Sequence, residues 1–395
     1  DPTRAKAPEF LVRCNKMNCM MACGGPEGTF RLRCYACCRH QIMERNAVPT
    51  SSATLLFRVS RPLVLLSIAA LAFGFASGVA AQQPRVLKIS HQFPASTGAD
   101  GDFRDQLARK FAADVEIRTN GSLKVEVYPA SSLVKTFAQF GAVRKGALDM
   151  SVLPIAYGGG EVPEANLGLM PALITSYEQG LRWKDAPIGK EWSKLLEDRG
   201  IRIVTWVWQA GGIAGLTKAV VSPDDAKGMK IRGGSKEMDM MLKGAGAAIT
   251  NVPSNEIYSA MQSGVLDAAL TSSTSLISFR LYETGKNVTT ARKNTFWFMF
   301  EPLVISKSVY DSLTKEQQRA IDEVGASLEK FALDAAKVDD VRMAEVYAKN
   351  GAKVFDMDDA TFAKWRAIAQ ETAWDDFAKN VKDGKRWLDM ATAVK

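Results

Sequence analysis

The feature that most constrains the fold is a repeated junction in which an amphipathic helical segment ends at a glycine and a short apolar segment follows. This junction recurs at Gly121, Gly146, Gly200, Gly246 and Gly264. Glycine just past a helix end accepts the left-handed backbone that closes the last turn. Helices that alternate with strands are typical of a largely parallel sheet covered on both faces, so we predict an α/β fold.

Two of these junctions resemble each other, which suggests that the body consists of two related lobes. Residues 142–149 read AVRKGALD and residues 260–267 read AMQSGVLD, so both keep the pattern Ala-x-x-x-Gly-x-Leu-Asp. A chain of 395 residues is long enough for two domains of medium size. We expect the first lobe at 82–208 and 298–335, the second at 209–297, and at 336–395 the end of a long helix and C-terminal helices that pack on the second lobe.

A long amphipathic helix is predicted over residues 314–349. Thr314-x-x-Gln317 is a capping box, apolar residues then recur at helical spacing, and Asn350-Gly351 ends the segment. At 1.5 Å per residue such a helix is roughly 54 Å long, more than the width of one small domain. We expect it to lie across both lobes; the alternative is two helices broken near Gly325.

Residues 58–81 have the pattern of a signal peptide. Arg58 and Arg61 begin it, an apolar run follows over 63–79, and small residues end it at Ala81. A membrane anchor is the alternative, but we expect cleavage and a location in the periplasm. The preceding residues 1–57 are interpreted as an upstream extension, disordered or not native. A zinc site within its cluster ending Cys34-x-x-Cys37-Cys38-x-His40 is the other possibility.

The composition of the body argues against several classes of function. The net charge of +8 sits largely before residue 82, so the remainder carries 41 basic and 39 acidic residues and gives no reason to expect nucleic acid. All six cysteines lie within residues 14–38, and the body has one histidine, His91. The usual thiolate and imidazole metal sites and a Cys–His nucleophile pair are therefore excluded there, so we predict no metal, no cofactor and no enzyme.

Several segments, in order, resemble the extracytoplasmic solute-binding proteins of tripartite ATP-independent periplasmic (TRAP) transporters, of the dicarboxylate-binding DctP type. These segments are 87–97, 119–133, 142–150, 227–232, 252–258 and 264–267. The resemblance implies a two-lobed periplasmic binding protein fold with hinge-crossing strands and a long helix spanning both lobes. It also implies closure over a small organic carboxylate and delivery to a small and a large membrane permease subunit.

Arg232 is the residue most expected to hold the ligand. It ends a short apolar strand, and Gly233 and Gly234 follow it. Strand ends that face a crevice are where α/β sheets bind ligands, and a guanidinium matches a carboxylate with two parallel hydrogen bonds. In the family that it resembles, the matching arginine clamps the substrate carboxylate. The alternative is a surface arginine in an ordinary ion pair.

Further candidates come from the ends of neighbouring strands. Where many relatives place an asparagine, this chain has hydroxyls that either donate to the acid or form a polar hinge loop, and aromatic residues on the crossing strands either line the pocket or pack in the core. The expected ligand contacts besides Arg232 are Thr271, Ser272, Trp208, Trp297, Phe93 and Tyr157. We expect His91 and Glu256 to support these contacts from behind. Glu256 either braces the second lobe, together with Tyr258, or orients Arg232.

The sequence therefore predicts a transport receptor that captures a dicarboxylate, a 2-oxo acid or an aromatic acid by lobe closure. A sensory module of the same fold that feeds a membrane kinase is the alternative, and a secreted carboxylate-dependent enzyme is a weaker one. The sequence leaves open whether the protein is a monomer or a dimer.

Overall fold

The computed structural model describes residues 83–98 and 101–395, which belong to one compact unit, Gly78–Lys395. The predicted upstream extension, its possible zinc site and the signal peptide lie outside the described residues. Within the described part, no helix is both long and apolar enough to cross a membrane.

The first lobe is built on a five-stranded sheet with the order β2-β1-β3-β11-β4. Its strands are β1 (Arg85–His91), β2 (Leu123–Tyr128), β3 (Met150–Val152), β4 (Ile201–Thr205) and β11 (Leu303–Ser306). β1 runs parallel to β2 and β3, whereas β11 runs antiparallel to both of its neighbours. The parallel strands therefore end at one edge of the sheet, where His91 and Val152 are in register.

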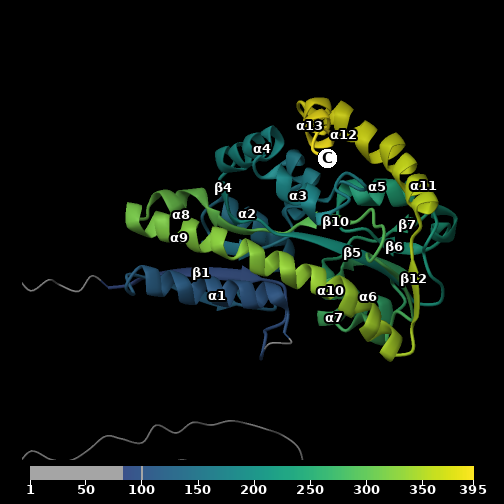
Figure 1. The fold of residues 1–395 in the computed structure, drawn as a ribbon, viewed down its shortest axis with the longest axis horizontal. Helices are drawn as coiled ribbons and strands as arrows, with labels where there is room; N and C mark the ends of the chain where they lie inside the picture. Colours follow the sequence, from purple (N-terminus) through teal and green to yellow (C-terminus); the bar gives the residue numbers. More distant parts are fainter. Residues whose placement is uncertain (1–82, 99–100) are drawn as a thin grey trace, which may run out of the picture. The chain divides into compact units, whose positions relative to one another are not determined.

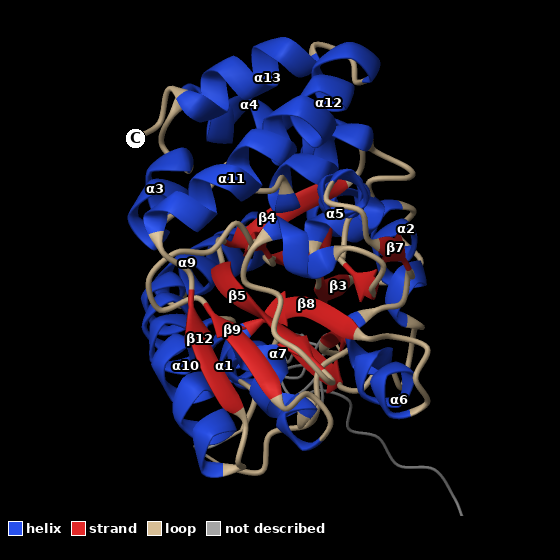
Figure 2. Ribbon diagram, turned by 90° about the vertical axis from the view of Figure 1, so that its right-hand side faces the viewer, coloured by secondary structure: helices blue, strands red, loops and turns tan. Residues whose placement is uncertain are grey.

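The second lobe is built on a sheet with the order β12-β9-β5-β8-β6-β7, and Figure 2 shows β12, β9, β5 and β8 side by side. The strands are β5 (Trp208–Gly215), β6 (Lys230–Arg232), β7 (Ala248–Ile249), β8 (Ala268–Ser272), β9 (Asn287–Thr290) and β12 (Lys353–Asp356), with β10 (Phe298–Phe300) paired to β5. β6 is parallel to β7 and β8, but β5 is antiparallel to β8, β9 and β10.

The sheets are thus mixed rather than largely parallel, for a reason that lies in the connections. The chain passes from β4 into β5 when it enters the second lobe and from β10 into β11 when it returns. The two crossing strands β5 and β10 run in opposite directions and pair with each other, and β11 enters the first sheet against its neighbours. Parallel pairing is retained between strands that follow a helix within one lobe.

The predicted glycine junctions are confirmed by backbone geometry. Gly121, Gly146, Gly200, Gly246 and Gly264 have φ values of 76°, 73°, 94°, 88° and 72°. All five are in the left-handed region that glycine enters without a steric cost. The junction pattern therefore indicated real helix ends.

The long helical segment spans both lobes, as expected, but it is divided at Leu328 rather than at Gly325. α9 (Lys315–Ser327) begins with the predicted capping box at Thr314 and contacts α1 (Phe103–Arg118) and β4. α10 (Glu329–Lys349) continues over β5, β9 and β12 of the second sheet (Figure 1). Gly325 has a packing role, because a Cβ there would lie 2.4 Å from the carbonyl oxygen of Val204.

Shorter helices cover the remaining faces of the sheets. They are α2 (Gln139–Arg144), α3 (Tyr177–Trp183), α4 (Pro187–Asp198), α5 (Lys236–Gly244), α6 (Ile257–Gln262), α7 (Ser273–Ser278), α8 (Lys307–Asp311), α11 (Asp359–Ala369), α12 (Asp375–Asn380) and α13 (Gly384–Thr392). The C-terminal helices differ in part from the expectation for 336–395. α11 packs on α5 of the second lobe, whereas α13 contacts α4 beside the first sheet.

The first lobe has a tightly packed aromatic core. Trp192 is fully buried, its Nε1 donates to the carbonyl oxygen of Glu164 at 2.9 Å, and its ring lies 5.3 Å from Phe300 and 6.2 Å from Trp183. This cluster fixes α4 against the crossing strand β10.

We predict that Trp192→Ala lowers the free energy of unfolding by about 3–5 kcal/mol, because it leaves a large cavity and removes a buried hydrogen bond. Denaturant titration followed by circular dichroism measures the change. Ile117→Ala is the control, since Ile117 is 73% exposed on α1 and should change the value by less than about 0.5 kcal/mol. Equal effects of the two substitutions would contradict this account of the core.

Candidate ligand-binding site

The two lobes are in contact along the edge where the parallel strands of the first sheet end. Thr136 Oγ1 donates to Asn255 Oδ1 at 3.0 Å, and Ser235 Oγ donates to the carbonyl oxygen of Leu169 at 3.1 Å. The backbone N–H of Ser254 donates to the Tyr157 hydroxyl at 3.2 Å. These contacts join residues that precede β4 with residues of the second lobe, so the lobes are closed on each other here.

Arg232 lies within this contact and is only 2% exposed. Its Nε donates to the carbonyl oxygen of Val252 at 3.1 Å, and its Nη1 donates to that of Leu270 at 2.7 Å. Its Nη2 donates to the Tyr157 hydroxyl of the first lobe at 2.8 Å. The guanidinium is therefore held by the second lobe and capped by the first, and these bonds use three of its five N–H groups.

The local sequence explains why the guanidinium fits there. Arg232 is the last residue of β6, and Gly234 follows with a φ of 103°. A Cβ at Gly234 would lie 2.7 Å from Arg232 Nη1, so only glycine leaves room for the side chain to fold back. The Nε1 of Trp297 donates to the carbonyl oxygen of Gly233 at 3.2 Å and fixes the turn.

The charge balance around Arg232 is unusual for a buried arginine. No carboxylate of residues 83–98 and 101–395 forms an ion pair with it. The nearest acidic influence is Asp239, whose Oδ1 accepts from the backbone N–H of Gly233 at 3.1 Å. Burial raises the pKa of Asp239 to about 6, against the opposing effect of Arg232. A buried cation without a paired anion is costly, which makes this position suited to an anionic ligand.

A cavity of about 580 Å³ opens beside this arginine. Residues of both lobes line it: Phe137, Ala156, Tyr157, Gly159, Gly160 and Asn166 from the first, and Gly234, Ser235, Lys236, Asp239, Met240, Lys243, Ile249 and Asn251 from the second. Arg232 itself is not part of this lining, but Tyr157 and Gly234 are, and the Tyr157 hydroxyl accepts from the guanidinium. The Phe137 ring packs edge-on against Tyr157 with centroids 5.0 Å apart.

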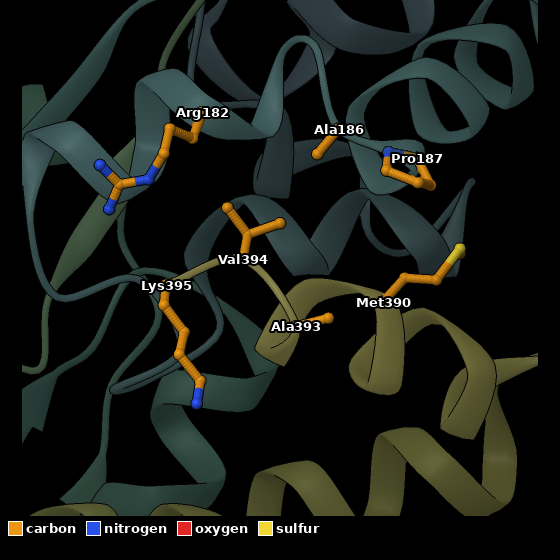
Figure 3. A pocket seen from close by; sticks show the side chains of 7 residues that line it. All are labelled: Arg182, Ala186, Pro187, Met390, Ala393, Val394 and Lys395. Carbon is orange, nitrogen blue, oxygen red and sulfur yellow. The ribbon is translucent and has the colours of Figure 1, made fainter.

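A second cavity, of about 510 Å³, lies elsewhere and has a different character (Figure 3). Its lining comes from the end of α3, the start of α4 and the last residues of the chain: Arg182, Ala186, Pro187, Met390, Ala393, Val394 and Lys395. The lining is mainly apolar and includes none of the predicted site residues. Among the described residues, no group of His, Asp and Glu is arranged to hold a metal ion.

Tyr157, Trp297 and Thr271 lie near Arg232. Tyr157 bonds to its guanidinium, and Trp297 bonds to the glycine that follows it. Thr271 is next to Leu270, whose carbonyl oxygen accepts from Arg232, and it pairs with Gly212 on the crossing strand β5. The structure brings these three predicted residues together with the arginine.

Trp208, Phe93 and Ser272 have other surroundings. Trp208 packs in the first-lobe core, with its ring 5.5 Å from that of Trp183. The Phe93 ring lies 3.7 Å from the guanidinium carbon of Arg104, and the hydroxyl of Ser272 accepts from Arg104 Nη1 at 3.2 Å. Phe93 and Ser272 are placed by their contacts with a second buried arginine, Arg104, which the sequence analysis did not single out. The alternation of side chains along a strand decides which face Trp208 occupies.

His91 and Glu256, the two residues expected to support the ligand contacts from behind, have surroundings of their own. His91 is buried on the same side as Phe93, with its Nε2 3.2 Å from Asp105 Oδ1. Glu256 is exposed, and its side chain is not among the hydrogen-bond partners of Arg232. The backbone carbonyl groups of Val252 and Leu270 orient Arg232 instead, and no sequence motif predicts such contacts.

Gln92 is a residue that the sequence analysis missed. It follows β1 directly, is 2% exposed, and neither atom of its side-chain amide has a hydrogen-bond partner among the described residues. The neighbouring His91 carbonyl oxygen accepts from the Ser131 N–H at 2.8 Å. The Ser131 hydroxyl is hydrogen-bonded to the Thr136 hydroxyl, and Thr136 in turn contacts Asn255 of the second lobe. Its place directly after a strand at the ligand-binding edge was the available signal.

We predict that Gly234→Ala is more destabilising than Gly264→Ala. Both positions have positive φ, so both substitutions should cost about 1 kcal/mol of backbone strain. The added methyl group meets nothing within 4 Å at Gly264 but meets the Arg232 guanidinium at Gly234. Denaturant titration should therefore show at least about 1 kcal/mol of additional loss for Gly234→Ala, and equal losses would contradict the close approach.

Comparisons with known proteins agree with this architecture. Residues 95–380 match the family described as bacterial extracellular solute-binding protein, family 7 (DctP). A solute-binding protein of Albidiferax ferrireducens is 59% identical over 299 residues, which cover 75% of this chain and 88% of that protein. The C4-dicarboxylate-binding periplasmic protein DctP of Rhodobacter capsulatus is 25% identical over 276 residues, covering 69% of this chain and 80% of that protein.

A solved structure is similar over the same region. It is a TRAP periplasmic solute-binding protein of Rhodoferax ferrireducens with bound malonate, 57% identical, with a TM-score of 0.77. The match covers 78% of this chain and 98% of that one. From the family match, these relatives and the two-lobed fold, we conclude that the chain belongs to family 7 of the bacterial extracellular solute-binding proteins, the DctP-type receptors of TRAP transporters.

Proposed function

We propose that this receptor captures a small organic carboxylate at Arg232 in the periplasm and delivers it to the small and large membrane subunits of a TRAP permease. The observation that carries the proposal is a buried guanidinium with no carboxylate partner among the described residues and two N–H groups left over. A planar guanidinium offers two parallel N–H bonds to a carboxylate, and an ionised pair in a dry site is stronger than in water.

The lobe contacts explain how binding would be coupled to closure. Arg232 is fixed by carbonyl groups of the second lobe, whereas Tyr157 approaches it from the first. A ligand shifts the equilibrium toward the closed form only through contacts that the open form lacks. The carboxylate supplies the anion that a closed, dry Arg232 otherwise lacks, so closure without ligand is discouraged.

The site favours a short acid whose second end is neutral or is held by neutral groups. The other fully buried arginine, Arg104, is already ion-paired with two carboxylates. The unpartnered amide of Gln92, which is able both to donate and to accept, is the group we assign to the far end of the ligand. Malonate bound to the similar Rhodoferax ferrireducens protein and the C4-dicarboxylate in the name of the Rhodobacter capsulatus relative support a short diacid.

A binding role also fits the chemistry of the body better than catalysis. Its relatives are solute-binding receptors rather than enzymes. Residues 83–395 contain no cysteine, and their single histidine, His91, lies against Asp105 away from Arg232. Delivery to a permease is supported by the TRAP relatives and by a closed form that presents both lobes in one fixed geometry.

We predict that a thermal-shift screen of short diacids, 2-oxo acids and aromatic acids raises the melting temperature for at least one acid, because a ligand that binds the folded state stabilises it by mass action. Arg232→Gln should weaken that acid's affinity roughly 100-fold or more, and Arg232→Lys should fall between, since lysine keeps the charge without the fork. Arg118→Gln, at an arginine 48% exposed on α1, is the matched control.

Two results would refute the assignment. One is an acid that binds the Arg232→Gln protein as tightly as the unsubstituted protein. The other is a screen in which only sugars or cations stabilise the protein. A retained circular dichroism spectrum establishes that each variant is folded.

We predict a smaller effect at Tyr157. Tyr157→Phe removes the hydroxyl that accepts from Arg232 Nη2 and from the backbone N–H of Ser254, both in the second lobe. The loss of these bonds across the lobes should weaken the affinity about five- to tenfold, as measured by isothermal titration calorimetry. Tyr128→Phe is the control, because that hydroxyl contacts the exposed Glu126. An unchanged affinity in Tyr157→Phe would remove Tyr157 from the site.

A further inference from the structure

The second fully buried arginine, Arg104, is surrounded by more negative charge than it carries. Its Nε and Nη2 donate to the two carboxyl oxygens of Asp102 at 2.8 and 2.6 Å, and its Nη1 donates to Glu301 Oε2 at 3.0 Å. Arg104, Asp102 and Glu301 are all buried, with side chains 0% exposed. One guanidinium thus faces two carboxyl groups, and the group carries a net negative charge when both are ionised.

Glu301 is the weaker partner of the two. Asp102 holds two of the guanidinium nitrogens, whereas Glu301 receives one arginine bond and one bond from Gln209 Nε2, both at the same oxygen. Its other oxygen, Oε1, has no partner among the described residues. Burial raises the pKa of Glu301 to about 7, against the opposing effect of Arg104. A proton on Glu301 would leave Arg104 and Asp102 as a neutral pair.

This cluster lies at a contact between the two lobes. Arg104 and Asp102 are at the start of α1 in the first lobe, and Arg104 Nη1 reaches Ser272 and Ser275 of the second lobe at 3.2 and 3.0 Å. Glu301 follows the crossing strand β10, and Gln209 is on the crossing strand β5. Separation of α1 from α7 would break the serine contacts and admit water to Glu301.

Other titratable groups near the cluster have partners of their own. Asp339 on α10 accepts from Thr274 Oγ1 at 2.7 Å and lies 3.9 Å from Arg342. Asp105, one residue beyond Arg104, is paired with Arg109 at 2.7 Å and lies against His91. Among the groups that face Glu301 directly, Arg104 and Asp102 are the charged ones.

We propose that the protein captures its carboxylate together with one proton, and that Glu301 is the proton site. In the open form Glu301 is hydrated and ionised; on closure it is buried beside Asp102 and takes up a proton from solvent. Each closing event binds one ligand anion and at most one proton, the fraction depending on pH, with no other bond formed or broken. The proposal rests on the proposed function for its ligand and adds the proton as a second species bound.

The sign of the pH dependence follows from the direction of the pKa shift. Glu301 has its ordinary value of 4.5 when exposed and about 7 when buried. Below the lower value both forms are protonated and closure costs no proton. As pH rises toward the higher value, closure requires an increasing proton uptake, so affinity falls; above about 7 the closed form is ionised too and the fall ends. Proton uptake is therefore confined to this window.

Isothermal titration calorimetry with malonate tests the proposal on the full chain. Heats are measured at pH 7 in phosphate and in imidazole buffers, whose ionisation enthalpies differ, so their difference gives the protons taken up. The expected uptake is about half a proton per malonate at pH 7 and almost none at pH 9. Malonate that binds without proton uptake at pH 7 would overturn the proposal while leaving the proposed function intact.

Matched variants assign the proton to a residue. Glu301→Gln should abolish most of the uptake and remove roughly a 10- to 100-fold fall in affinity, relative to the unsubstituted protein, between pH 5 and pH 8. Glu323→Gln, at a half-exposed glutamate of α9, should behave like the unsubstituted protein. Glu237→Gln tests the competing site, because burial also raises the pKa of Glu237, to about 8, on α5 beside Asn166 of the first lobe. Uptake lost in Glu237→Gln and retained in Glu301→Gln would overturn the assignment.

A measurement without ligand separates this proposal from the proposed function. Residues 82–395 contain no cysteine, and the crystallised relative is matched along 98% of its length by 78% of this chain, so this part folds on its own. Spin labels at Lys135→Cys and Gln262→Cys, both exposed and on opposite lobes, report closure as a distance distribution. The closed fraction should rise from pH 8 to pH 5, and not when Glu301→Gln is added. If the closed fraction does not change with pH, Glu301 is not the proton site, and this conclusion holds even if no acid binds the protein.

Discussion

The closed arrangement contains a buried cation, Arg232, that forms no ion pair with any described residue. Arg232 is buried between the lobes, and the groups that hold it are two backbone carbonyl oxygens and one hydroxyl. These neutral acceptors orient the guanidinium without cancelling its charge. An isolated buried charge is costly, so the stability of the closed form is incomplete until an anion arrives. In the proposed mechanism, this cost couples closure of the lobes to binding of the ligand.

Arg104 shows what a structural arginine looks like in the same protein. It is equally buried, but Asp102 and Glu301 more than balance its charge, and Phe93 covers one face of the guanidinium. The contrast separates the two roles on charge alone. Arg232 has no ion-pair partner among the described residues, whereas the Arg104 cluster has one more carboxyl group than it has cations, an excess that the proposed proton on Glu301 would remove. The two arginines contact nearby positions of β8. Arg232 donates to the carbonyl oxygen of Leu270, and Arg104 donates to the hydroxyl of Ser272.

Much of the fold was predictable because it depends on local pattern. Glycines after helix ends, the capping box at Thr314 and the spacing of apolar residues indicated two α/β lobes and a long helical segment across them. The mixed sheets were not predictable in this way, since strand direction is decided by which strands cross between the lobes. The close packing of Gly325 against β4, which is remote in sequence, was not predictable either.

For the site, the sequence by itself determined which kinds of chemistry the body can support. A body without cysteine and with one histidine argued against the usual metal sites and nucleophile pairs, and the family resemblance, together with an arginine at a strand end before two glycines, led to the prediction of Arg232 as the carboxylate contact. Only the tertiary structure decided which neighbours reach it. Strand alternation and long-range packing turned Trp208 and Phe93 away from Arg232, left Glu256 exposed, and brought Tyr157 from the other lobe to the guanidinium. The sequence also could not predict that Arg104, Asp102 and Glu301 are buried together. The charge balance of a buried cluster depends on distances between segments that are far apart along the chain.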